Sequence, residues 1–353
     1  MPTLYEKIYG CLAASRVGSA MGAIVERWTP EEIEAKYGFL DHLDRYAHFQ
    51  MHGIQWDREP GTTEDGIERQ NLMSRAIIAR QDRITAEDMM KMTVEVVNPE
   101  NALFMSMPDD IKMVHFMKVG VPYPHVGSLS GWHGLNAMAR ASHPIGLINA
   151  GDPEGAFRDA QDVGRLIFAP HDFALVWAGV LDAAIAAALL PDATLLSVLD
   201  IALSFANDHM KREIRRALDI TALHTDFKTL RNEFYTIYNS AGVMFASATA
   251  SETVTKAFAV FAFAKGDAKK AILYGTNFGR DTDCLAAMAG GLAGALSGIG
   301  AVPKEWLEQV DKATFMNPYT NTQWTIKQHA DGIYSALKNR AKKIRSQLEV
   351  LES

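Results

Sequence analysis

The most informative stretch for the fold of this chain is Gly279-Arg280-Asp281-Thr282-Asp283-Cys284. It is followed by the run Leu-Ala-Ala-Met-Ala-Gly-Gly-Leu-Ala-Gly-Ala-Leu-Ser-Gly, which ends at Gly298. The run consists almost entirely of small and apolar residues, which predicts a buried helix. Asp281 can cap that helix, but Asp283 then lies in its first turn, inside a buried element. Because an unpaired ion in a low-dielectric interior costs on the order of several kcal/mol, Asp283 needs a counter-charge.

The nearby sequence offers few cations for this purpose. Arg280 is the cation within the motif, and no Lys follows Asp283 until Lys304. A hard divalent cation is the alternative partner, since Mg²⁺ prefers carboxylate, hydroxyl and water oxygens. A helix N-cap followed by a solvated acidic first turn would explain the same residues without a metal. The segment alone leaves both interpretations open.

A second acidic cluster lies near the N-terminus, in Gly61-Thr62-Thr63-Glu64-Asp65-Gly66. Adjacent carboxylates behind a Thr hydroxyl again put hard oxygen ligands at the start of a predicted helix. A capping box with additional acidic residues is the simpler interpretation of this cluster taken by itself. Two such clusters, far apart in sequence and each opening a long helix, favour two halves of one metal site.

In the order of these motifs the chain resembles the ADP-ribosylglycohydrolases, the family that includes the dinitrogenase reductase-activating glycohydrolases. Thr63–Gly66 is similar to the family's Thr-Asp-Asp-Thr motif, and Gly279–Cys284 is similar to its Gly-Gly-Asp-Thr-Asp-Thr/Ser motif. Gly22-Ala23-Ile24-Val25-Glu26 is similar to the Gly-Ala-x-x-Glu pattern that ends the family's opening helix. The resemblance extends from about Ile8 to Gly298 and includes Asn136–Arg140, Pro144–Leu147 and His171.

The resemblance implies a hydrolase that cleaves a glycosidic bond to ADP-ribose or a related ribosyl group. Carboxylates manage the oxocarbenium-like transition state of such a reaction, and a metal can clamp the ribose hydroxyls and lower the pKa of a bound water. The implied cofactor is Mg²⁺, as one or two ions, with Mn²⁺ as an alternative. The implied metal ligands are Thr63, Glu64, Asp65, Asp281 and Asp283, and the implied catalytic residues are Glu26, Asp65 and Asp283.

Glu26 would face the anomeric carbon, as a base or as a substrate gate. A surface ion pair with Arg27 or Lys36 is the alternative explanation of this residue. The middle of the chain would bind the rest of the ligand, because amides in its glycine-rich stretch could cradle a phosphate, although ordinary loops also contain Gly and Ser. A neutral His171 could hydrogen-bond a phosphate-linked ribose, or it could be a core or capping histidine. The expected substrate-binding residues are Gly127, Ser128, Gly131, Gly134, Asn136 and His171.

The chain departs from the family motifs at Glu64, Gly66, Arg280 and Cys284. Glu64 is one methylene longer than Asp, Gly66 has no side chain, and a thiol such as that of Cys284 is a poor ligand for Mg²⁺. One metal could therefore be lost, or water could fill the vacant positions. The same departures leave open a glycosidase for a small ribosyl or nucleoside metabolite, a catalytically silent ADP-ribose binder, and a structural protein.

Composition agrees with an enzyme-sized globular chain, since 48% of its 353 residues are hydrophobic and 22% are charged. No Pro-, Ser- or Gly-rich linker divides the chain, so we expect a single domain over residues 1–353. Its class is expected to be all-α, an orthogonal helical bundle. Helical periodicity predicts helices over 4–21, 30–37, 64–80, 86–96, 153–168, 171–190, 194–207, 211–223, 226–238, 251–264, 267–274, 282–297, 304–312 and 325–348.

Small residues recur four apart in two of these helices, at Gly10, Ala14, Gly18 and Gly22 and at Gly290, Gly294 and Gly298. Glycine in a helix interior costs up to about 1 kcal/mol relative to alanine, which makes sense where backbones approach closely. We expect the two helices to cross near the centre of the bundle, which would bring Glu26 and the Asp281–Asp283 pair to a common cleft. Tight packing without a functional site would explain the glycines equally well.

Cys11 and Cys284 lie in apolar, helix-like stretches, which favours buried free thiols in a reducing cytoplasm. The net charge of −7 argues against broad nucleic-acid binding. The first residues lack the order of a signal peptide. The uncharged run 284–302 is too rich in Ala and Gly for a membrane span, so a buried core helix is expected. The expected partner is a small-molecule or ADP-ribosylated substrate, and the oligomeric state stays open.

Overall fold

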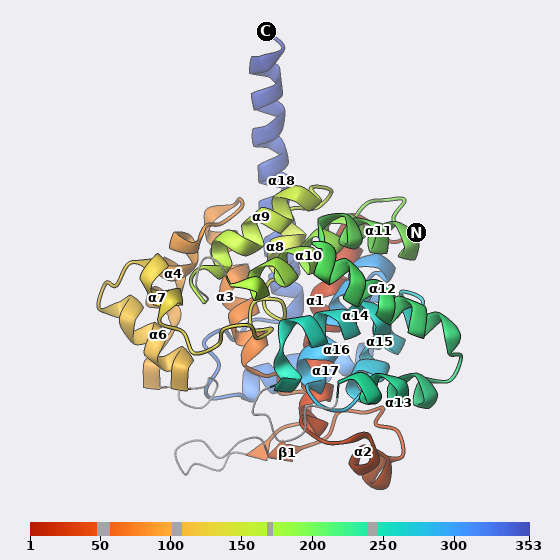
Figure 1. The fold of residues 1–353 in the computed structure, drawn as a ribbon. Coiled ribbons are helices and arrows are strands. Elements are labelled where there is room, and N and C mark those ends of the chain that lie inside the picture. The colour runs from red at the N-terminus through yellow and green to blue at the C-terminus, as the bar shows by residue number, and fades with distance from the viewer. Residues whose placement is uncertain (48–56, 101–107, 168–171, 239–245) are drawn as a thin grey trace.

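The computed structural model describes residues 1–47, 57–100, 108–167, 172–238 and 246–353. Helices make up most of this part of the chain (Figure 1), which confirms the all-α class. Two short strands, β1 (Tyr46–Ala47) and β2 (Asp57–Arg58), pair antiparallel and place Tyr46 opposite Arg58. This small ribbon matters for the site, because both of those side chains reach the first acidic cluster.

The helices agree closely with the predicted ranges, and α2, α4 and α16 agree at both ends. Their bounds are α1 Leu4–Gly22, α2 Pro30–Tyr37, α3 Asp65–Arg80, α4 Ala86–Val96, α6 Pro108–Lys118, α7 Tyr123–Ser128, α8 His143–Ile148, α9 Pro153–Gly164, α10 Phe173–Ala188, α11 Leu195–Phe205, α12 Asp208–Leu223, α13 Phe227–Ile237, α14 Ala250–Phe263, α15 Ala268–Thr276, α16 Thr282–Ser297, α17 Lys304–Met316 and α18 Ile326–Leu351. Short 3₁₀ helices add η1 Ala23–Val25, η2 Ala246–Ala248 and η3 Ile299–Ala301.

Helices α6, α7 and α8 were not predicted from periodicity. The last two have six residues each and contain Pro and Gly, as at Pro144 and Gly146 of α8, which hide a short helix from periodicity. Proline is nevertheless favourable in the first turn, where its missing N–H has no partner to lose. The start of α9 follows the same rule, because Asp152 accepts from the Gly155 amide at 2.9 Å and Pro153 is the first residue of the helix.

Helices α1 and α16 lie side by side in the middle of the molecule (Figure 1) and touch along their whole length. A Cβ added to Gly10 would lie 2.6 Å from the Gly294 carbonyl oxygen, and one added to Gly18 would lie 2.3 Å from the Ala286 carbonyl oxygen. Residues early in α1 therefore meet residues late in α16, so the pair is antiparallel. The expected close approach is confirmed, but the helices run alongside each other instead of meeting at one crossing point.

The hydrophobic core surrounds this pair and includes residues from Ile8 to Ala336. Cys11 and Cys284 are both buried and free, as predicted. The segment Leu4–Val25 is long and apolar enough to cross a bilayer, but 94% of its most apolar window is buried inside the protein, as in the core helix of a soluble protein. The last turns of α18 extend away from the other helices (Figure 1) and are exposed from residue 341 onward.

Candidate metal and catalytic site

The antiparallel pairing brings the end of α1 to the start of α16. The Thr282 hydroxyl donates to the Gly22 carbonyl at 2.7 Å. Beyond that contact, the Arg27 amide donates to the Arg280 carbonyl at 2.6 Å, and the Arg280 amide donates to the Trp28 carbonyl at 3.0 Å. These bonds hold the segment that carries Glu26 against the segment that carries Asp281, as the sequence analysis predicted.

Asp281, Asp283 and Cys284 form a compact group at this end of α16, and one ligand atom from each lies within 4.8 Å of the other two. Asp281 is 6% exposed and Asp283 is 4% exposed. Within the described part of the chain, the buried Oδ1 of Asp283 has no hydrogen-bond partner. A buried carboxylate oxygen without a donor is costly, and a cation is the partner that would relieve that cost.

Asn136 takes part in this group in a way that the sequence did not indicate. Its side-chain amide donates to Asp281 Oδ2 at 2.6 Å and to Thr253 Oγ1 at 3.1 Å. Asn136 was expected to bind substrate, and the structure places it against a carboxylate of the cluster. This contact fixes the orientation of the Asp281 carboxylate within the group.

The electrostatics of the cluster follow from burial and from like charges. Burial raises the pKa of Glu26 to about 8, and the neighbouring charges of Asp281 and Glu64 add to the rise. Burial, followed by the charges of Glu26 and Asp281, also holds the pKa of Asp283 well above its usual range. Arg27 lies 3.8 Å from Glu26, but the Glu26 side chain is only 16% exposed, so this is no simple surface ion pair. A bound cation would reverse such shifts.

Glu64 of the first acidic cluster is engaged by the strand pair. Its Oε1 accepts from the Tyr46 hydroxyl at 2.6 Å and forms a buried ion pair with Arg58. Glu64 is also the N-cap residue of α3, although its side chain does not cap the helix. A predicted metal ligand is thus paired with a cation of the protein in this structure.

Asp65 is engaged by two arginines. Arg140 Nη2 lies 2.5 Å from Asp65 Oδ2, and Arg69 Nη1 lies 3.2 Å from the same oxygen. The other end of the Arg140 guanidinium reaches the second cluster, with Nη1 3.4 Å from Cys284 Sγ and 3.9 Å from Asp283 Oδ2. The two acidic motifs are therefore brought together as predicted, and the guanidinium of Arg140 joins them.

Arg140 is the residue of the site whose role the sequence analysis missed. Its segment was noted only for its resemblance to a family motif. Gly66 could have indicated that another side chain packs here, because its lack of a side chain leaves space at the start of α3. A Cβ on Gly66 would lie 2.9 Å from Arg140 Cδ, so the arginine stem fills that space.

Arg280, another departure from the family motif, has a structural explanation. Its φ of 69° lies in the left-handed region that favours glycine, where an ordinary residue is strained by roughly 1 kcal/mol or more. Its guanidinium binds the buried Glu252 of α14 with both ends, at 2.7 Å and 3.0 Å. This charge-assisted, bidentate contact offsets the strain.

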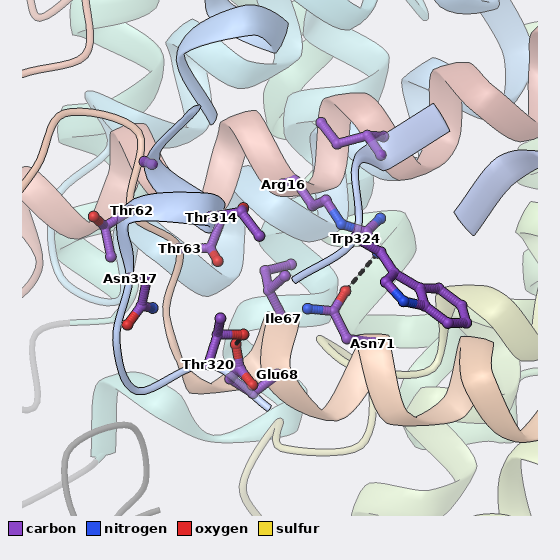
Figure 2. A pocket seen from close by; sticks show the side chains of 12 residues that line it. Arg16, Thr62, Thr63, Ile67, Glu68, Asn71, Thr314, Asn317, Thr320 and Trp324 are labelled. Atoms are coloured by element: carbon purple, nitrogen blue, oxygen red, sulfur yellow. Dashed lines mark hydrogen bonds between the residues drawn. The ribbon is translucent and has the colours of Figure 1, made fainter. Parts of the chain in front are cut away.

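Thr63 lines a small polar pocket beside the first cluster (Figure 2). Arg16 Nη2 donates to Asn71 Oδ1 at 2.6 Å in this pocket, and the buried Glu68 accepts from Thr320 Oγ1 at 2.6 Å. The charged groups of the pocket are thus bound to the protein itself. Thr63, predicted as a metal ligand, borders both this pocket and the acidic cluster.

The glycine-rich segment differs from the predicted phosphate cradle. Gly127 and Ser128 belong to α7, and the Ser128 hydroxyl donates to the Pro124 carbonyl at 2.9 Å. The Gly134 amide does bind an anion, but that anion is the Asp172 carboxylate, at 3.1 and 3.2 Å. Gly131 is exposed in the turn between them. The predicted substrate residue His171 lies outside the described residues.

These features define an all-α protein in which two central helices bring together a buried Asp-Asp-Cys group that could hold a metal ion. The chain belongs to the ADP-ribosylglycohydrolase family, whose model matches residues 1–342. It is 23% identical over 341 residues to the uncharacterized protein YegU of Escherichia coli (strain K12), covering 93% of this chain and 99% of that protein. Its fold is similar to a solved structure of an ADP-ribosylglycohydrolase-related protein complex, with a TM-score of 0.64, 16% identity, and coverage of 96% and 99% of the two chains.

Proposed function

We propose that this protein is a metal-dependent hydrolase that cleaves a glycosidic bond to ADP-ribose or to a related ribosyl group. The family and the fold support a glycohydrolase of ADP-ribose-type substrates. One observation carries the metal dependence, namely the buried Asp281–Asp283 pair beside Glu26. In the described chain Asp283 Oδ1 has no hydrogen-bond donor, so the pair has an oxygen available for an ion.

The donor set of Asp281 and Asp283 fits a hard divalent cation. Both aspartates offer carboxylate oxygens, which Mg²⁺ and Mn²⁺ accept, whereas the Cys284 thiol suits neither ion. When bound, such an ion would polarise a sugar hydroxyl or a water oxygen at this end of α16. Asn136 would keep Asp281 in position for the ion through its 2.6 Å hydrogen bond.

Glu26 is the carboxyl group that we assign to proton transfer. Burial and the charge of Asp281 raise its pKa to about 8 in the metal-free protein, and a cation bound beside Asp281 would lower that pKa. In the metal-bound protein the ionised carboxylate would accept a proton from the attacking water. Its burial at the end of η1 also limits the access of bulk water to that proton.

A product assay by mass spectrometry tests the proposal. The purified protein is incubated with and without Mg²⁺ and offered ADP-ribosylated arginine, serine and nucleic-acid ends, O-acetyl-ADP-ribose, and common nucleosides and nucleotides. Metal-dependent release of free ADP-ribose is the expected result, and Asp283→Ala should abolish it. Release of a smaller sugar would identify a glycosidase of ribosyl or nucleoside metabolites. Binding of ADP-ribose without any turnover would identify a silent binder and contradict the proposal.

A further inference from the structure

The strongest unassigned feature of the molecule is the position of Arg140 between the two acidic motifs. Its side chain is 15% exposed, and each end of its guanidinium faces a different motif, Asp65 on one side and Asp283 with Cys284 on the other. An ion that bridged Asp65 and Asp283 would have to occupy the space that this guanidinium fills. The protein therefore already supplies a positive charge at that place.

The backbone supports this arrangement at Gly66. The arginine stem passes over Gly66, with Cγ 3.1 Å and Nε 3.2 Å from where a Cβ would stand. A larger residue at Gly66 would push against the stem, so the missing side chain and the buried guanidinium are two parts of one feature. Arg69 contacts the same oxygen of Asp65 and also pairs with the buried Asp110. Asp65 is thus fixed by protein cations and is poorly placed to bind an ion as well.

Asp283 divides its two oxygens between two directions. Oδ2 faces the Arg140 guanidinium at 3.9 Å, whereas Oδ1 is buried and has no hydrogen-bond partner among the described residues. Oδ1 of Asp283 and the carboxylate of Asp281 are therefore the oxygens of this group that we expect to bind an ion. We propose that Arg140 supplies the cation between Asp65 and Asp283, so that the site holds a single divalent ion next to Asp281. This inference rests on the metal dependence proposed above and adds the number of ions.

Ion counting on the full-length protein tests it. The protein is stripped with a chelator and titrated with Mn²⁺ alone, and bound ions are counted by elemental analysis and by electron paramagnetic resonance. We expect one Mn²⁺ per chain and a spectrum of isolated ions. Two ions per chain with a coupled spectrum would overturn the single-ion inference and leave the proposed hydrolase intact. No bound ion would overturn both.

Two matched variants locate the effect. Arg140→Met keeps the unbranched stem of the side chain but removes the charged guanidinium, so a second Mn²⁺ should bind between Asp65 and Asp283 and the count should rise from one to two. Arg69→Met also removes a cation from Asp65, but Arg140 still fills the space, so the count should stay at one. A folded Arg140→Met protein that still binds one ion would overturn the assignment. If Arg140→Met does not fold, the number of Mn²⁺ ions bound by the wild-type protein and their spectrum still decide between one ion and two.

Discussion

Cys284 lies in the candidate metal site but offers a poor ligand to a hard cation. Its sulfur lies 3.5 Å from Asp283 Oδ2 and 3.4 Å from Arg140 Nη1, and its side chain is buried. Burial raises the pKa of the thiol well above its ordinary value, with further contributions from Asp281 and Asp283, so the sulfur stays protonated. A protonated thiol in this position is a poor partner for a hard cation.

Replacing that sulfur by oxygen should strengthen metal binding. We predict that Cys284→Thr increases the Mg²⁺ affinity by about tenfold, roughly 1.4 kcal/mol, because a hydroxyl oxygen is a ligand that Mg²⁺ accepts. Isothermal titration calorimetry measures the change. Cys284→Ala is the matched control, since it removes the sulfur without adding oxygen. Equal affinities for the Thr and Ala variants would show that position 284 does not reach the ion.

A second residue-scale feature lies outside the site, at Asp182 in α10. Asp182 is fully buried, and the neighbouring Ser142 hydroxyl offsets only part of the effect of that burial. Burial holds its pKa well above the ordinary value of 3.8. The folded protein therefore binds the Asp182 proton more tightly than the unfolded chain does.

The sign of the pH dependence follows from that difference. The contribution of Asp182 to stability is complete below its unfolded pKa of about 3.8 and declines as the pH rises toward its folded pKa, at about 1.4 kcal/mol per pH unit. Asp182→Asn should remove this decline and make the protein more stable at pH 8 but not at pH 4. Urea unfolding in the presence of a chelator measures it. Asp200 is exposed, so Asp200→Asn should leave the free energy of unfolding unchanged at both pH values. If Asp182→Asn shows the same dependence of stability on pH as the wild-type protein, the prediction is contradicted.

At the scale of elements, the contact between α1 and α16 positions the site. Gly22 faces Thr282 so closely that an added Cβ would lie 2.3 Å from the Thr282 carbonyl oxygen. The first-turn carboxylate Asp283 then follows directly, and Glu26 lies just beyond the end of α1. The spacing of the two helices thus sets how close these carboxylates come.

A single methyl group should test this dependence. Gly18→Ala places a Cβ 2.3 Å from the Ala286 carbonyl oxygen, and backbone on both sides cannot yield locally. We predict a loss of at least about 2 kcal/mol in the free energy of unfolding, together with weaker Mg²⁺ binding as the helix ends separate. Chemical denaturation and calorimetry measure the two effects. Gly300→Ala is the control, because nothing lies within 4 Å of its added Cβ, and equal stability of both variants would refute the packing argument.

At the scale of the whole molecule, metal binding should stabilise the folded chain. The site joins the end of α1 to the start of α16, and its ligands are assembled only in the folded protein. A ligand that binds only the folded state at one hundred times its Kd adds about 2.7 kcal/mol. We therefore predict that Mg²⁺ raises the melting temperature by a few degrees and that a chelator reverses the rise.

Asp283→Ala provides the control for this prediction. The variant should stay folded, because it removes a buried carboxylate whose charged form is disfavoured by burial and by its neighbours. Its melting temperature should no longer respond to Mg²⁺. A response equal to that of the wild-type protein would show that the ion binds elsewhere.

Much of the fold could be predicted from the sequence because it depends on local properties. Periodicity and caps placed most helices close to their observed bounds, and α16 agreed at both ends. The spaced glycines predicted that α1 and α16 approach closely, since glycine in a helix interior is costly without such contact. The positions of Glu26 and of the Asp281–Asp283 pair at the helix ends then predicted that these carboxylates meet.

Only the tertiary structure decided which partners the acidic groups have. The guanidinium of Arg140 pairs with Asp65, which is far away in the sequence. No pattern of neighbouring residues predicts that pairing. In the same way, Asp172 takes the Gly134 amide that was expected to bind phosphate, and Asn136 binds Asp281. Caps and periodicity depend on neighbours in the chain, whereas these contacts depend on how distant helices pack. The sequence by itself therefore determined the helical class and the carboxylates of the site, and packing decided which of them remain available for an ion.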